Sequence, residues 1–160
     1  MSDLRRFQDP LAIQRAIHRA RTIAIVGLSA NQLRASNFVA YYLKRHGYRV
    51  IPVNPRETEI LGEVSYASLT EVPVAVDIVN VFRVPAAVPE IAQEAVTIGA
   101  GTLWCQFGVI NEEGAQLAED GGVTVIMDRC LKVEHARYLG RMHWLGFNTG
   151  RITSVRSGIQ

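Results

Sequence analysis

Short apolar runs alternate along the chain with segments of helical periodicity. Continuous apolar runs rich in β-branched residues are typical of strands that are buried on both faces of a parallel sheet. Five such runs predict strands at residues 22–27, 48–53, 76–82, 102–107 and 123–128. Since helical patterns separate these runs, the sequence predicts an α/β fold: one doubly wound parallel sheet of about five strands, covered by helices on both faces.

The predicted helices lie between the strands, at residues 10–20, 36–46, 85–98, 111–119 and 131–140. Asp9 followed by Pro10 is the usual start of a helix, with an N-cap residue and then proline in the first turn. Ser36 is expected to cap the second helix, which would carry Phe38, Val39 and Leu43 on one side.

Length and composition fit a single globular domain. The chain has 160 residues and a mass of 17.7 kDa, with 48% hydrophobic and 20% charged residues. We expect one domain over residues 1–140, followed by a basic C-terminal tail at residues 141–160.

Charge and cysteine content exclude several classes of function. A net charge of +2 gives no broad electrostatic footprint for nucleic acid. Two cysteines are too few for a disulfide framework. The N-terminal residues lack the apolar core of a secretory signal, and no apolar run has the roughly 18–20 residues of a membrane span. We therefore expect a cytoplasmic protein without a membrane partner, and a homo-oligomer is possible.

Arginine recurs directly after the predicted strands. In a doubly wound sheet, ligands bind beyond the carboxyl ends of the strands, so these segments are the place to look for a site. Arginines follow four of the five strands, at positions 34, 56, 83 and 129. Guanidinium groups gathered at one edge indicate a polyanionic ligand such as a nucleotide phosphate.

The first strand–helix turn does not carry a dinucleotide fingerprint. Gly27 occupies the first glycine position of G-x-G-x-x-G, but Ser29 and Gln32 stand in the second and third. The second strand ends in Asn54-Pro55-Arg56, without the carboxylate that binds the ribose of NAD. NAD is therefore disfavoured, whereas NADP stays open, and no P-loop for splitting ATP is present.

A run of motifs in order resembles the small CoA-binding protein family. These motifs are VGLS, RASNFVAYYLKRHGYRVIPVNP, VDIVNVFR, LWCQFGV and MDRCLKVEHAR, which together span roughly residues 10–140. The family is a stand-alone, Rossmann-like domain similar to the CoA-binding domain of the succinyl-CoA synthetase alpha subunit. The resemblance implies that coenzyme A lies across the strand ends. Since the 160 residues include no phosphohistidine segment and no ATP-grasp partner, we expect binding of CoA or acyl-CoA without catalysis.

The resemblance also implies a role for individual residues. The phosphates would meet Gly27, Ser29, Arg34 and Ser36. The nucleotide would be framed by Asn54, Pro55 and Arg56, and the middle of the ligand by Phe82 and Arg83. The strand-end segment Trp104, Cys105 and Gln106 would contact the pantetheine.

Structural alternatives accompany several of these assignments. Ser36 can serve only as a helix cap, and Arg56 can pair with Glu57 or Glu59. Arg83 can form a salt bridge, and core packing is the commoner fate of Trp104 and Cys105.

Other functions also stay open at this point. One is an NADP-binding oxidoreductase or a subunit of one, and another is an interaction subunit whose pocket has lost its ligand. Cys130, near the start of a predicted helix, is a candidate for a mixed disulfide with the CoA thiol.

Overall fold

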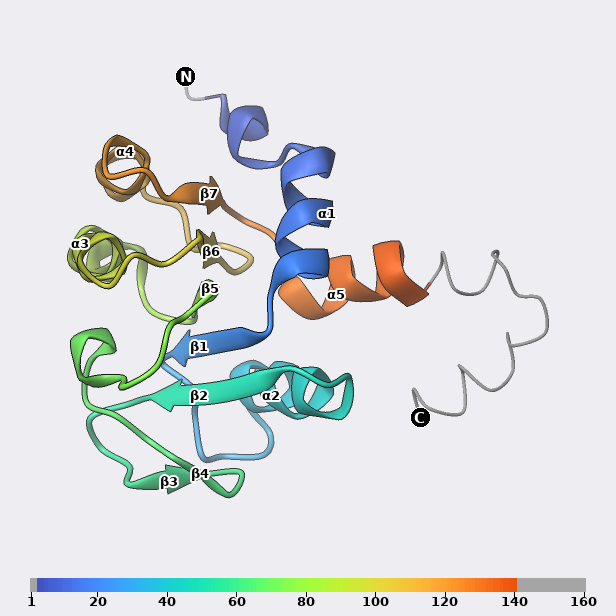
Figure 1. Cartoon of the computed structure of the whole chain (residues 1–160), viewed down its shortest axis with the longest axis vertical. Coiled ribbons are helices and arrows are strands. Elements are labelled where there is room, and N and C mark those ends of the chain that lie inside the picture. Colours follow the sequence, from blue (N-terminus) through green and yellow to red (C-terminus); the bar gives the residue numbers. More distant parts are fainter. Residues whose placement is uncertain (1–2, 141–160) are drawn as a thin grey trace.

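A five-stranded, fully parallel sheet forms the centre of the computed structural model, which describes residues 3–140. Its strand order is β2-β1-β5-β6-β7 (Figure 1). The strands are β1 (Thr22–Val26), β2 (Arg49–Val53), β5 (Ile78–Val81), β6 (Thr102–Cys105) and β7 (Thr124–Ile126). This architecture confirms the predicted α/β, Rossmann-like, doubly wound fold. The predicted basic tail, residues 141–160, lies outside the described residues.

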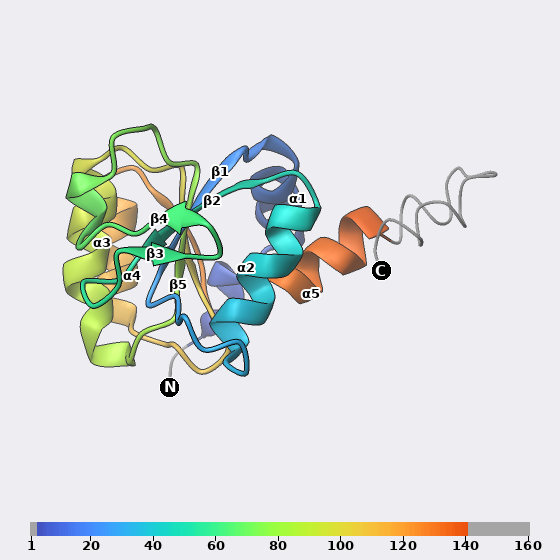
Figure 2. The ribbon, with the colours of Figure 1, turned by 90° about the horizontal axis from the view of Figure 1, so that it is seen from below.

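Helices cover both faces of the sheet. One face carries α1 (Pro10–Arg19), α2 (Ala35–Arg45) and α5 (Leu131–His135), and the other carries α3 (Val88–Thr97) and α4 (Glu112–Asp120) (Figures 1 and 2). The shorter helical turns are η1 (Leu4–Phe7), η2 (Leu69–Glu71), η3 (Pro85–Ala87) and the π-helical turn η4 (Ala136–Gly140). None of the helices in residues 3–140 is long and apolar enough to cross a membrane.

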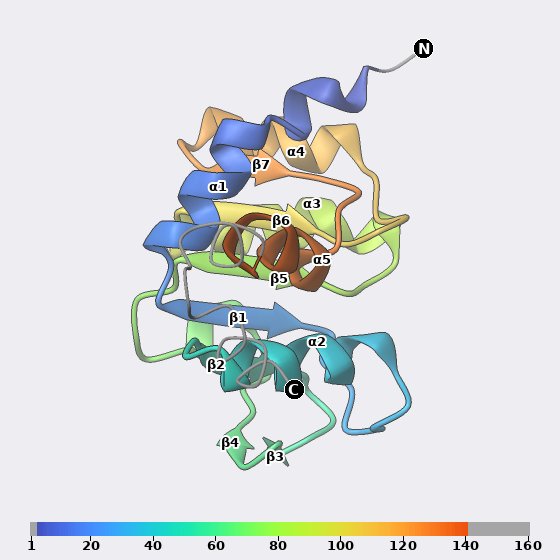
Figure 3. The same ribbon diagram turned by 90° about the vertical axis from the view of Figure 1, so that its right-hand side faces the viewer.

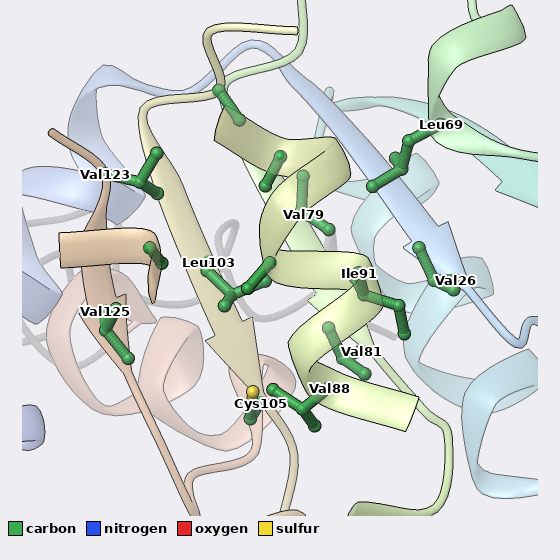
Figure 4. Close-up of a cluster of buried hydrophobic side chains, with 14 of the residues drawn as sticks. Val26, Leu69, Val79, Val81, Val88, Ile91, Leu103, Cys105, Val123 and Val125 are labelled. Atoms are coloured by element: carbon green, nitrogen blue, oxygen red, sulfur yellow. The ribbon is translucent and has the colours of Figure 1, made fainter. Parts of the chain in front are cut away.

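Alternate residues of each strand supply the two cores on either side of the sheet. In β1, Ala24 and Val26 pack toward α3 and α4, while Ile23 and Ile25 pack toward the other helical layer. The α3 side is drawn in Figure 4, where side chains of β5, β6 and β7 lie against that helix. Burial on both faces explains why the strands are continuous apolar runs.

The strand order places a crevice between β1 and β5. The chain leaves β1 for β2 on one side and later returns to β5 on the other side. The connections after β1 and β5 therefore diverge, which opens a ligand site beyond the carboxyl ends of these strands. Figure 3 shows the strand arrowheads pointing toward this edge.

A short hairpin between β2 and β5 was not predicted. It pairs β3 (Glu59–Ile60) with β4 (Glu63–Val64) in antiparallel fashion. Both loop residues, Leu61 and Gly62, have positive φ, as a type I′ turn requires. Strands of two residues are too short to produce a recognisable periodicity.

The start of α2 corrects two predictions. The N-cap is Arg34, and Ser36 lies one residue inside the helix. Phe38 does not share the buried face of Val39 and Leu43, because 57% of its surface is exposed.

Candidate functional site

A cleft of about 670 Å³ lies beyond the carboxyl ends of β1 and β2. Its lining comes from four places: the ends of the two strands with the segments that follow them, the start of the segment after β5, the segment before η2, and one side of α3. Of the predicted site residues, the structure brings six into this cleft: Gly27, Arg34, Asn54, Pro55, Arg56 and Arg83.

Gly27 allows the end of β1 to approach the end of β5. Its φ of +89° is a conformation that side chains disfavour, and a Cβ there would overlap the carbonyl oxygen of Phe82. The amide of Gly27 donates to the carbonyl of Val53 at 3.0 Å, so this residue also joins β1 to the end of β2.

Ser29 and Ser36 shape the loop between β1 and α2. The Ser36 hydroxyl accepts a hydrogen bond from the Ser29 amide at 2.9 Å. The Asn37 side-chain amide donates to the Ser29 carbonyl at 2.8 Å. Neither serine lines the cleft, so both position the loop that carries Arg34.

Asn54 holds the loops after β1 and β2 together. Its Nδ2 donates to the carbonyl of Leu28 at 2.9 Å, and its Oδ1 accepts from the amide of Arg56 at 2.8 Å. Its own amide donates to the carbonyl of Tyr66 at 2.8 Å. These bonds place Pro55 and Arg56 at the mouth of the cleft.

The guanidinium groups of the three cleft arginines are unpaired in the described part of the chain. Arg34, Arg56 and Arg83 are exposed, and within residues 3–140 none of them forms an ion pair or donates from its guanidinium. The alternatives of a local pair for Arg56 and a salt bridge for Arg83 are therefore absent from the described part of the chain. Arg129, after β7, is different, because its guanidinium donates to the Asp128 carbonyl and to Gln8 Oε1.

The wall formed by α3 is the part of the site that sequence reasoning missed. Glu90, Ile91 and Glu94 line the cleft from this helix, and Ala87 does so from its N-cap position. Ala67 and Ser68 line the cleft from the segment before η2. Glu94 Oε1 accepts from the Leu69 amide at 3.1 Å. The spacing of the three helical residues predicts that they share one side of the helix, but no signal in the sequence indicates that this side borders a cleft.

Four predicted residues lie away from the cleft lining. Phe82 is half-buried and packs with the α1–α2–α5 core, and Trp104 is fully buried there. Cys105 is fully buried on the opposite side of the sheet, where burial raises the pKa of its thiol to about 12. Gln106 Oε1 accepts from Asn80 Nδ2 and from the Leu131 amide.

Two further features concern chemistry rather than binding. Cys130 is nine-tenths buried as the N-cap of α5 and does not line the cleft. In residues 3–140, no three histidine, cysteine or acidic side chains gather as a group that could hold a metal ion.

A doubly wound sheet with a cleft at its switch point defines a protein of the Rossmann-like α/β class. Comparison with known proteins narrows this class. The family model described as a CoA binding domain matches residues 21–136, and the chain belongs to this family.

Two curated relatives differ in how much of their length the chain covers. It is 43% identical over 124 residues to the uncharacterized protein YneT of Bacillus subtilis. This alignment covers 78% of this chain and 92% of that protein. It is 31% identical over 122 residues to acetate–CoA ligase (ADP-forming) I of Archaeoglobus fulgidus. That match covers 69% of this chain but only 18% of the ligase, so the chain corresponds to a small part of the enzyme.

A solved structure supports the fold over most of the chain. A hypothetical protein from Pyrococcus horikoshii OT3 superposes with a TM-score of 0.82 at 33% identity, covering 88% of this chain and 99% of that one. The comparisons give no support to the alternative of an NADP-binding oxidoreductase.

Proposed function

We propose that this chain binds coenzyme A or an acyl-CoA in the carboxyl-edge cleft. The observation that carries the proposal is the set of three unpaired arginines, Arg34, Arg56 and Arg83, around one cavity at the switch point. CoA carries a diphosphate and a 3′-phosphate, and guanidinium groups form strong charge-assisted hydrogen bonds with such groups. Membership of the CoA binding domain family supports the same ligand.

The start of α2 adds a second attraction for the diphosphate. Arg34 caps this eleven-residue helix without a side-chain hydrogen bond to its first turn. The helix amino terminus therefore presents backbone N–H groups and the positive end of the helix dipole. We place the diphosphate here, against the loop that Ser29 and Ser36 hold in shape.

The adenosine end fits between β2 and α3. Asn54, Pro55 and Arg56 frame one side of this space, and the buried side chain of Ile91 offers an apolar contact on the other. Arg56 at the cleft mouth is the natural partner of the 3′-phosphate. The carboxylate of Glu90, exposed on the same wall, can accept from a ribose hydroxyl or the adenine amino group.

The pantetheine arm is proposed to pass Phe82 and Arg83 toward the end of β6. Trp104 and Cys105 are buried in the cores, so their part in binding would be to hold the strand end in position. Gln106 Oε1 already accepts two hydrogen bonds, whereas its Nε2 donates to none of the described residues, so Nε2 would be the atom that donates to a pantetheine carbonyl. We propose that the chain binds without catalysing a reaction and presents its ligand to a partner.

A thermal-shift comparison on the ligand-stripped full chain tests the proposal. The ligands are CoA, dephospho-CoA, acetyl-CoA, NAD and NADP. A ligand that binds only the folded state adds about 2.7 kcal/mol of stability at 100 times its Kd. CoA is expected to raise Tm, and dephospho-CoA to raise it less because the 3′-phosphate contact is lost.

The other ligands distinguish the alternatives. A shift with acetyl-CoA equal to that with CoA would mean that the thiol end lies outside the contacts. A shift with NADP alone, or no shift with any CoA compound, would overturn the proposal.

A further inference from the structure

A second cavity, of about 310 Å³, lies at the opposite edge of the sheet. The helix α1 forms its wall, and the residues at the amino ends of β5, β6 and β7 form its floor. Figure 3 shows α1 running over the strands toward the side on which they begin. No residue of this amino-edge cavity also lines the carboxyl-edge cleft.

The sequence of α1 makes room for the cavity. Ala12 and Ala16 lie four residues apart on one side of the helix, and Ala20 is its C-cap residue. Their short side chains leave space between the helix and the strand ends. Arg15 and Arg19, also four residues apart, border the same space.

Both of these arginines are without a partner. They are exposed, and within residues 3–140 neither forms an ion pair or a side-chain hydrogen bond. Arg6, by contrast, is paired with Glu119 at 2.7 Å. Interaction with the helix dipole favours a cation in the last turn, where Arg19 lies, but it does not explain a second arginine one turn earlier beside a cavity.

The floor of the cavity adds polar groups that can contact a ligand. Thr102 is only 6% exposed as a residue, and it lines the cavity. Its hydroxyl makes no hydrogen bond to any of the described residues, so it is free to contact a ligand. Asp77 Oδ2 accepts from the amides of Arg21 and Thr22 at 2.8 and 2.9 Å, which offsets part of its charge.

We propose that this cavity binds a small anionic metabolite. Arg15 and Arg19 would hold its phosphate or carboxylate group by charge-assisted hydrogen bonds. The Asp77 carboxylate would accept a hydrogen bond from a hydroxyl or amino group elsewhere on the same molecule. The Thr102 hydroxyl would donate a hydrogen bond to such a group. The volume is at the small end of the range for ligand sites, which favours a compact ligand over a nucleotide.

The proposal does not depend on CoA binding. The residues of α1 lie before the segment matched by the family model, which starts at residue 21. The carboxyl-edge cleft would also attract phosphate, so the test is made in the full chain carrying Arg34→Gln and Arg83→Gln.

The experiment is an NMR titration of the backbone amides with inorganic phosphate. We expect saturable shifts at millimolar phosphate in the amides of Ala16–Ala20, Asp77 and Gly101–Thr102. The added pair Arg15→Gln and Arg19→Gln should weaken this binding at least about tenfold, because two charge-assisted contacts are lost.

Two further variants complete the test. The control pair Arg21→Gln and Arg49→Gln removes the same charge from the same edge outside the cavity, and should change the affinity less than about twofold. Thr102→Val removes the hydroxyl that lines the cavity without changing charge, and should also weaken binding. Shifts that never saturate, or equal weakening by both arginine pairs, would overturn the proposal.

Discussion

At the scale of single residues, the side chains at the carboxyl edge divide into two kinds. Asn54, Ser29 and Ser36 are engaged in hydrogen bonds that fix the loops. Arg34 and Arg83 instead place charge in the cleft without stabilising contacts of their own. Substitutions of the hydrogen-bonded side chains should therefore affect stability and binding together. Substitutions of the two arginines should affect binding alone.

The arginines give the most direct prediction. Arg34→Ala and Arg83→Ala should each weaken CoA binding by roughly 1.5–3 kcal/mol, the range for hydrogen bonds to charged groups. Isothermal titration calorimetry measures the loss, and Tm without ligand should stay almost unchanged. Arg49→Ala, an exposed arginine outside the cleft, is the control. Unchanged affinity in both cleft variants would show that the ligand does not contact these side chains.

Gly27 can be tested against a glycine with similar backbone geometry. Gly27 and Gly108 have φ of +89° and +78°, but a Cβ at Gly108 meets no atom within 4 Å. Gly108→Ala should cost about 1–2 kcal/mol through its backbone alone. Gly27→Ala should cost at least about 1 kcal/mol more, because its Cβ would collide with the Phe82 carbonyl. Urea denaturation measures both, and equal losses would contradict the close approach of β1 and β5.

At the scale of elements, Asn54 couples the loops after β1 and β2. Asn54→Asp retains the acceptor for the Arg56 amide but loses the donor to the Leu28 carbonyl. We expect a loss of about 1–3 kcal/mol in stability and a parallel loss in CoA affinity, because a buried carbonyl is left unpaired. Asn31→Asp is the control, since Asn31 uses only its Oδ1 as an acceptor from the Leu33 amide. Retained affinity in Asn54→Asp would show that the two loops bind independently.

The contact of α5 with α2 depends on a neutral histidine. His135 is 5% exposed, and its Nδ1 lies 2.8 Å from the Tyr42 hydroxyl. Burial first, and then the nearby His46 and His18, lower the pKa of His135 to about 4. Burial also raises the pKa of Tyr42 to about 12, so its hydroxyl remains protonated.

This arrangement predicts a loss of stability in mild acid. The unfolded chain takes up the proton near the ordinary pKa of 6.5, whereas the folded chain does so only near 4. The contribution of neutral His135 to the free energy of unfolding is therefore present above pH 6.5 and falls as the pH drops toward 4. The expected loss between pH 7.5 and 5 is about 2 kcal/mol. Urea denaturation at both pH values measures it, and His135→Gln should remove this part of the dependence. A variant with the same pH profile as the parent chain would refute the assignment.

At the scale of the whole molecule, charge is distributed locally rather than globally. The net charge is only +2, yet unpaired arginines gather at two cavities on opposite edges of the sheet. Electrostatic attraction of a ligand therefore depends on a few nearby groups, and salt screens such exposed groups over about 10 Å at 0.1 M.

The salt dependence of affinity should therefore differ between the phosphate end and the pantetheine end of CoA. The affinity for CoA is expected to fall between 50 and 500 mM salt, and the fall should be smaller in Arg34→Ala. Pantetheine, which has no phosphates, should bind with little salt dependence. Calorimetry at a series of salt concentrations makes the comparison, and a salt-independent affinity for CoA would exclude a phosphate-directed cleft.

The five strands of the parallel sheet, most of the helices and the fold class follow from local patterns in the sequence. Continuous apolar runs are a local property, and they require a sheet that is covered on both faces. The tertiary structure decided which loops meet. Strand order brings Arg34, Arg56 and Arg83 to one cleft and leaves Arg129 elsewhere. It also places α3 against that cleft and buries Trp104 and Cys105 in the cores. Local patterns cannot predict these outcomes, because contacts between distant segments depend on the order and register of the strands.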